Sequence, residues 1–194
     1  MGERNELYPV FLKLDQLEVL LVGGGNVGLE KLTSLLSNSP NAKITIVAPS
    51  IKKEIIELTS AHPTIKILSK KYHEADLDNK DLVILATDDK ELHRRIKNLA
   101  GEKHILVNVA DTPDLCDFYL SSIVKKGNLK IAISTNGKSP TAAKRIRELL
   151  EVTLPEEIDE LLINLNLIRN KISGDFAQKV KELNELTRIL AEKK

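Results

Sequence analysis

The chain has 194 residues, of which 42% are hydrophobic and 29% charged, and its formal net charge is +1 at pH 7. This composition is ordinary for a globular protein with a substantial core. The small net charge and the aromatic content of 3% argue against a nucleic-acid-binding protein, and no apolar run approaches the roughly 20 residues that span a membrane.

Strand and helix patterns alternate through the first half of the chain. Residues 19–22 are continuously apolar, which is typical of a strand buried on both faces of a parallel sheet. A helix pattern follows to about Ser37. Further strands are predicted at 42–48, 64–68, 81–86 and 105–109, with helices after Pro49-Ser50 and at about 90–100. This alternation predicts an α/β fold over residues 1–112, a Rossmann-like doubly wound parallel sheet.

The pattern changes after residue 112. Runs at 118–124 and 129–134 predict two strands joined as a hairpin by residues 125–128. Ser139-Pro140 is typical of a helix start, and the helix is expected over 141–152. Pro155 opens another helix, Gly174-Asp175 ends it, and a last helix follows. We therefore expect a hairpin-plus-helix part at 113–150 and a C-terminal helical part at 151–194.

A glycine turn connects the first strand to the first helix. Gly23 permits a tight turn, Gly25 allows backbone to approach a ligand, and Gly28 lets the helix sit close to the strand. The helix N-terminus offers N–H groups and a positive dipole end to a pyrophosphate. A purely structural turn is the alternative, but the order of strand, turn and helix favours dinucleotide binding.

Other segments should meet this turn, because the carboxyl ends of parallel strands lie at one edge of the sheet. The acidic residue that usually binds the adenosine ribose is absent, since position 48 is Ala. Lys52 and Lys53 could instead accept a 2′-phosphate, so spacing leaves NAD and NADP open. Thr87 is expected to approach the cofactor through its backbone, and at least one of Asp88 and Asp89 to cap the next helix.

Asp111 is the carboxylate with the most suggestive position, just past a strand end where the second part of the chain begins. There it could take a proton while hydride leaves a substrate. The alternative is that Asp111 serves only as a turn residue before Thr112-Pro113. Position alone does not decide between the two.

Basic residues gather further along, at Lys138, Lys144, Arg145 and Arg147. A solvated helix face is the favoured explanation, and a polyanionic ligand at the loop 134–139 is the alternative. The four histidines lack zinc-binding spacing, so no metal site is expected. Cys116, the only cysteine, is expected to be structural; no intrachain disulfide can form, and with a polar N-terminus unlike a signal peptide this indicates a cytoplasmic protein.

Several blocks in order resemble the precorrin-2 dehydrogenase family, also known as the N-terminal part of siroheme synthase. They are Tyr8 to Leu12, Val22 to Gly28 with Lys31, Ala86 to Asp89, Val107 to Asp111, and the most specific one, Cys116 to Phe118 through Ile133 to Pro140.

The resemblance implies NAD-dependent oxidation of precorrin-2, a polycarboxylate tetrapyrrole, to sirohydrochlorin. The family's cofactor contacts fall on Asn26, Val27, Pro49 and Ser50. They join the cofactor-binding residues expected from the sequence pattern itself, Gly23, Gly25 and Thr87. This favours NAD over NADP. The family's essential aspartate matches Asp111, as a general base. Expected substrate contacts are Asn108, Thr135 and Lys138.

The resemblance also implies a homodimer formed through the middle and helical parts, and some family members insert Fe²⁺ into sirohydrochlorin. The competing hypothesis is a regulatory dinucleotide-sensing module, which would use the same glycine turn and dimerise. Such a module would need neither Asp111 nor a basic cleft, and the block from Cys116 to Pro140 argues against it.

Overall fold

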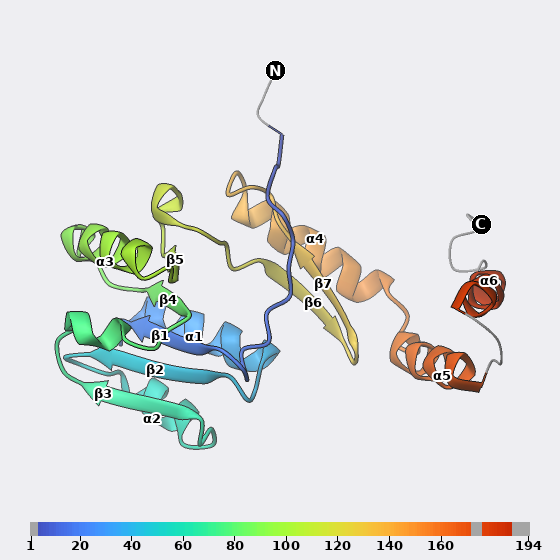
Figure 1. The fold of residues 1–194 in the computed structure, drawn as a ribbon, viewed down its shortest axis with the longest axis horizontal. Helices are drawn as coiled ribbons and strands as arrows, with labels where there is room; N and C mark the ends of the chain where they lie inside the picture. The colour runs from blue at the N-terminus through green and yellow to red at the C-terminus, as the bar shows by residue number, and fades with distance from the viewer. Residues whose placement is uncertain (1–3, 172–175, 188–194) are drawn as a thin grey trace. The chain divides into compact units, whose positions relative to one another are not determined.

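The computed structural model describes residues 4–171 and 176–187 (Figure 1). The chain divides into two compact units. Glu6–Leu120 forms the first, here called the sheet unit, and Ser121–Lys194 with the first five residues forms the second, the hairpin unit. The sheet unit extends beyond the expected boundary at 112, because Phe118 and Leu120 pack against its core.

Five parallel strands form the sheet in the order β3-β2-β1-β4-β5, which can be followed in Figure 1. Their bounds are β1 Glu18–Val22, β2 Lys43–Ala48, β3 Ile65–Ser69, β4 Leu82–Leu85 and β5 Leu106–Val109. Val22 pairs with Val47 on one side and with Leu85 on the other, so the strands end together at one edge. The chain order reverses between β1 and β4, the point at which doubly wound sheets bind ligands. The predicted fold class is confirmed.

Helices cover both faces of the sheet because successive residues of each strand point to opposite sides. Val19 and Leu21 belong to a core cluster shared with α1 (Asn26–Asn38) and α2 (Lys53–Thr59). Leu20 and Val22 belong to a second cluster, shared with α3 (Lys90–Glu102) and the 3₁₀ helix η1 (Glu74–Leu77). Burial on both faces explains why the central strands β1 and β4 read as continuous apolar runs.

The expectation of a strand beginning at residue 118 was wrong for its first four residues, since β6 spans Ser122–Lys126. A 3₁₀ helix, η2 (Pro113–Leu115), precedes this segment. Phe118 and Leu120 do alternate like strand residues, but both pack against the first core cluster. The Phe118 carbonyl accepts a hydrogen bond from the Asn108 side chain at 2.8 Å instead of joining a ladder.

The hairpin unit contains the antiparallel pair β6 and β7 (Leu129–Ile133), followed by α4 (Pro140–Thr153), α5 (Ile158–Lys171) and α6 (Phe176–Thr187). Val124 of β6 and Ala143 of α4 are buried. Asp159 of α5 fixes the hairpin turn, accepting hydrogen bonds from the backbone and side chain of Asn128. The expected helix break at Gly174-Asp175 lies outside the described residues. None of the helices described here is long and apolar enough to cross a membrane.

Candidate functional site

Close packing requires glycine at two positions of the turn after β1. Gly23 has φ +126°, and a Cβ there would lie 2.2 Å from the Ala86 carbonyl oxygen. A Cβ on Gly28 would lie 2.3 Å from the Gly23 carbonyl oxygen. Gly25 differs, because its Cβ would meet nothing within 4 Å. The open side of the turn is therefore at Gly25, where a ligand can approach the backbone.

The N-terminus of α1 is left available to an anion. Its N-cap residue is Gly25, no side chain among the described residues caps it, and its first turn holds no acidic residue. By contrast, α3 begins with Asp89, whose carboxylate accepts a hydrogen bond from the Leu92 N–H at 2.9 Å. This confirms the capping role expected for one of the two aspartates. Since α1 has no such cap, its N–H groups and dipole can bind a phosphate group.

The segment after β2 is seated against the glycine turn. The Lys52 N–H donates to the Gly24 carbonyl at 2.9 Å, and a Cβ on Gly24 would lie 2.4 Å from the Ser50 carbonyl oxygen. Pro49 and Ser50 are exposed there, as is Asn26 at the start of α1, whereas Val27 packs against the first core cluster. The sheet edge thus brings together the four residues that the family resemblance gives to the cofactor.

Thr87, which follows β4, is bonded to a histidine that sequence reasoning did not select. The Thr87 Oγ1 and His93 Nε2 atoms are 2.9 Å apart. The His93 side chain is 3% exposed, and its Nδ1 has no hydrogen-bond partner among the described residues. Burial lowers the pKa of His93 although Asp89 and Asp88 act in the opposite direction. The ring is therefore a neutral support for the turn at the end of β4.

Asp111 lies in a turn after β5, exposed and with φ +56°. The Ala110 N–H donates to the Leu85 carbonyl at 2.9 Å, which ties this turn to the end of β4. Asp tolerates the left-handed conformation better than most residues. Both the turn and the carboxylate are thus at the same sheet edge as the glycine turn.

The residues around this turn hold it in place. The Cys116 Sγ accepts from the Val109 N–H at 3.2 Å and donates to the Val109 carbonyl at 3.3 Å. Burial raises the pKa of this thiol, so Cys116 is a structural thiol as expected. Asn108 is 6% exposed and its amide donates to the Phe118 carbonyl. Asp117 pairs with Lys97 of α3 and accepts from the Val107 N–H. These hydrogen bonds therefore tie the end of β5 to the segment 116–118, on the two sides of the turn that contains Asp111.

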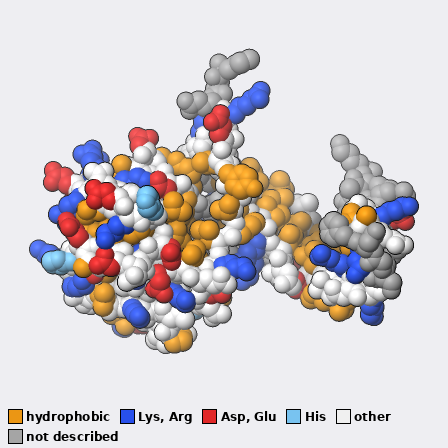
Figure 2. All heavy atoms as spheres, in the orientation of Figure 1, with side chains coloured by type: hydrophobic (Ala, Val, Ile, Leu, Met, Phe, Trp, Pro, Cys, Tyr) orange, Lys and Arg blue, Asp and Glu red, His pale blue; other side chains and the backbone are white. Residues whose placement is uncertain are grey.

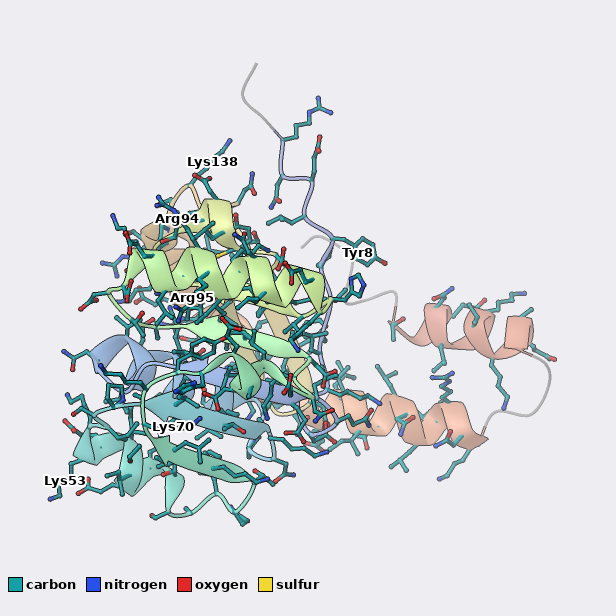
Figure 3. The ribbon with its side chains drawn as sticks, turned by 60° about the vertical axis from the view of Figure 1, so that its left-hand side comes forward. Tyr8, Lys53, Lys70, Arg94, Arg95 and Lys138 are labelled. Carbon is teal, nitrogen blue, oxygen red and sulfur yellow. The ribbon has the colours of Figure 1, made fainter. Side chains whose placement is uncertain are left out.

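Thr135 and Lys138 belong to the hairpin unit, in the loop between β7 and α4. The Thr135 Oγ1 accepts from the Ser139 N–H at 3.2 Å, and the Ser139 side chain caps α4 by accepting from the Ala142 N–H at 3.1 Å. Lys138 is exposed, and Figure 3 shows it projecting outward from this loop. Asn136 and Gly137 both have positive φ, so the loop makes a tight reversal before the helix.

Two further features of the described residues are the distribution of charged side chains and the spacing of side chains that could bind a metal ion. On the face that Figure 2 shows, acidic and basic side chains are interspersed over the sheet unit. In the part of the chain that the structure describes, no three His, Cys, Asp or Glu side chains are grouped so that they could hold a metal ion.

Two family models match the chain. One, described as "Putative NAD(P)-binding", covers residues 10–122, and the other, "Sirohaem biosynthesis protein central", covers residues 126–153. The solved structure of "SirC, precorrin-2 dehydrogenase" superimposes with a TM-score of 0.73 at 28% identity, covering 93% of this chain and 89% of that one. The chain belongs to the precorrin-2 dehydrogenase family.

Siroheme synthases are among the relatives. That of Pseudoalteromonas translucida is 39% identical over 168 residues, which cover 87% of this chain and 35% of the relative. That of Psychrobacter arcticus is 39% identical over 174 residues, 90% of this chain and 30% of the relative. This precorrin-2 dehydrogenase family member therefore spans about a third of the length of such relatives. Its NAD(P)-binding match includes both the glycine turn and Asp111, and its central match includes Thr135 and Lys138.

Proposed function

We propose that this protein catalyses the NAD-dependent dehydrogenation of precorrin-2 to sirohydrochlorin. The observation that carries the proposal is the exposed Asp111 carboxylate at the same sheet edge as an uncapped, glycine-rich helix N-terminus. Dehydrogenation removes one hydride and one proton from the macrocycle while a double bond forms. A hydride-accepting cofactor site beside a proton-accepting carboxylate meets both requirements.

The residues at the sheet edge fit a dinucleotide. Gly23 permits the tight turn, and Gly25 lets the backbone approach the pyrophosphate. The helix α1 begins at Asn26 and Val27, whose backbone N–H groups would face the pyrophosphate. The exposed Pro49 and Ser50 would contact the adenosine part of the dinucleotide. Thr87 would contact the dinucleotide at the end of the neighbouring strand. When bound, NAD⁺ supplies the hydride acceptor.

Asp111 acts as the general base in this proposal. The backbone of Asp111 is in the left-handed region, and the hydrogen bonds of Cys116 with Val109 and Thr112, on either side of Asp111, hold that turn. An exposed carboxylate with a fixed backbone can accept the proton that leaves the macrocycle as the hydride departs.

Thr135 and Lys138 are the proposed substrate contacts of the hairpin unit. Lys138 and Thr135 lie in a loop before a helix N-terminus, and the charge of Lys138 complements the carboxylates of the tetrapyrrole. For Asn108, burial and the bond to the Phe118 carbonyl favour a supporting role in the sheet unit over a direct substrate contact.

The proposal is tested by Asp111→Asn, with Asp114→Asn as the matched control. Asp114 is an exposed aspartate three positions further on, in η2. We expect Asp111→Asn to lower kcat for sirohydrochlorin formation, followed anaerobically by absorbance, by about 10²- to 10⁴-fold. NADH binding should be unchanged, and the control should retain activity. If the Asp111 variant kept full activity, Asp111 would not be the base.

Fe²⁺ insertion into sirohydrochlorin, the second activity that the family resemblance allows, has a readout of its own. Siroheme absorbance after adding Fe²⁺ to the completed dehydrogenation would measure it, compared with a reaction from which protein has been removed. If the family's aspartate collects the pyrrole protons here too, Asp111→Asn would slow both steps.

A further inference from the structure

Three polar side chains form a network at the start of α2, next to the glycine turn. The Lys52 ammonium donates to Asn26 Oδ1 at 2.7 Å and pairs with the Glu54 carboxylate at 3.1 Å. The Lys52 backbone is itself bonded to the Gly24 carbonyl. The network is therefore fixed to the turn that would receive the dinucleotide.

This network lies in the segment that would bind the adenosine ribose. In dinucleotide-binding domains of this kind, an acidic residue about 20 positions beyond the turn usually accepts a hydrogen bond from the ribose 2′-hydroxyl. Here that strand end is Ala48, followed by exposed Pro49 and Ser50. A charged residue that distinguishes a 2′-hydroxyl from a 2′-phosphate would therefore lie further along, and Lys52, paired with Glu54, is the charged residue bonded to the turn.

We propose that Glu54 is a specificity-determining residue that makes this protein prefer NAD over NADP, by holding and neutralising Lys52. The inference rests on the proposed function, because it takes a dinucleotide at the glycine turn as given. With Glu54 in place, its carboxylate neutralises the charge of Lys52. A 2′-phosphate would then gain little attraction from Lys52 and would be repelled by the negative charge of Glu54. Without Glu54, the Lys52 ammonium remains beside Asn26 and attracts the 2′-phosphate.

A second lysine–glutamate pair on the same helix gives a natural comparison. Lys53 and Glu57 are 3.2 Å apart, with side chains 86% and 61% exposed. Figure 3 shows Lys53 projecting outward from α2. In the inner pair, the Lys52 side chain is 35% exposed and the Glu54 side chain 54% exposed, so the two pairs differ chiefly at the lysine. Solvent and salt screen the outer pair more strongly, so only the inner pair should affect a bound dinucleotide.

The test is a fluorescence titration of the full chain with NADH and with NADPH. We expect Glu54→Gln to tighten NADPH binding about tenfold while NADH affinity changes by less than about threefold. Adding Lys52→Gln to that variant should abolish the gain. The control Glu57→Gln should leave the ratio of the two affinities unchanged.

An unchanged ratio in Glu54→Gln would overturn the inference, as would an equal shift in Glu57→Gln. Neither result would affect the proposed function, provided that the unsubstituted protein binds NADH. A protein that bound neither nucleotide would instead contradict the cofactor site on which both proposals stand. Glu54 is exposed on the surface of α2, and thermal unfolding of each variant would verify that it is folded.

Discussion

His93 illustrates how a buried side chain supports a site without being part of it. Its ring is almost fully buried, one nitrogen is bonded to Thr87, and the other has no partner among the described residues. A second proton on this ring would place a charge in the apolar cluster between α3 and the sheet. The neutral form is therefore the one that the fold accommodates.

This environment predicts a pH dependence of stability. Burial lowers the pKa of His93 in the folded protein below its ordinary value of 6.5, so the unfolded chain binds the proton more readily. The stabilisation is complete above about pH 6.5 and is lost as pH falls through the lowered pKa. Denaturant unfolding of the wild type and of His93→Gln measures it. The stability of the wild type relative to the variant should fall below about pH 6.5 and be constant above it.

A difference between the two proteins that stayed constant over the whole acidic range would mean that His93 does not titrate in this way. The same titration also separates His93 from the carboxylates, because these lose their charge at lower pH.

At the scale of elements, the unit formed by β1, the glycine turn and α1 separates two uses of glycine. Gly23 is required by the fold, since its φ is positive and the Ala86 carbonyl occupies the space of a Cβ. Gly25 has φ −90°, which any residue adopts, and open space around it. The fold therefore does not explain glycine at position 25, whereas a ligand approaching the backbone does.

Alanine substitutions at these two positions should separate stability from binding. Gly23→Ala should lower the free energy of unfolding by about 2 kcal/mol or more, because the new Cβ clashes with backbone. Gly25→Ala should leave that free energy within about 1 kcal/mol of the wild type but weaken NADH binding about tenfold or more. Denaturant unfolding and NADH fluorescence titration measure the two effects. Unimpaired NADH binding by folded Gly25→Ala would place the dinucleotide elsewhere.

The elements also differ in how far the sequence could predict them. The strands of the sheet were visible because burial on both faces leaves a continuous apolar run, as in residues 19–22. The strand expected to begin at 118 was extended too far, since the pairing of the Phe118 carbonyl with Asn108 depends on tertiary contact.

Local sequence patterns predicted the glycine turn and the position of Asp111 at a strand end. They could not reveal the bond between Thr87 and His93, or that between Asn26 and Lys52, because each joins side chains from different elements. The left-handed backbone of Asp111 was equally hidden, since aspartate is common in turns of several kinds.

For the whole molecule, the homodimer that the family resemblance implies stays a prediction, and the exposed apolar surface of the hairpin unit supports it. Ile146, Leu149 and Val152 of α4 are 43%, 64% and 87% exposed, and Ile163, Leu167 and Ile168 of α5 are also exposed. Figure 2 shows hydrophobic side chains at the surface around these helices. A second copy of the chain that covered α4 would remove this surface from water.

Leu149→Asp should therefore convert the protein to a monomer, because a carboxylate in an apolar interface is left without a partner. Lys144→Ala, on an exposed polar position of the same helix, should not. Sedimentation measurements on both variants report the oligomeric state. NADH binding should survive in the Leu149 variant, since the glycine turn lies wholly in the sheet unit. A wild-type protein that sedimented as a monomer would contradict the homodimer.

A dehydrogenase, as proposed for this protein, consumes its dinucleotide in the reaction, whereas a sensing module only binds it. The most direct measurement is an anaerobic reaction with precorrin-2 and NAD⁺ in which NADH and sirohydrochlorin are quantified together. We expect NADH and sirohydrochlorin to form in equal amounts through many turnovers. Tight dinucleotide binding without formation of either product would contradict it, and would favour a regulatory dinucleotide-sensing module.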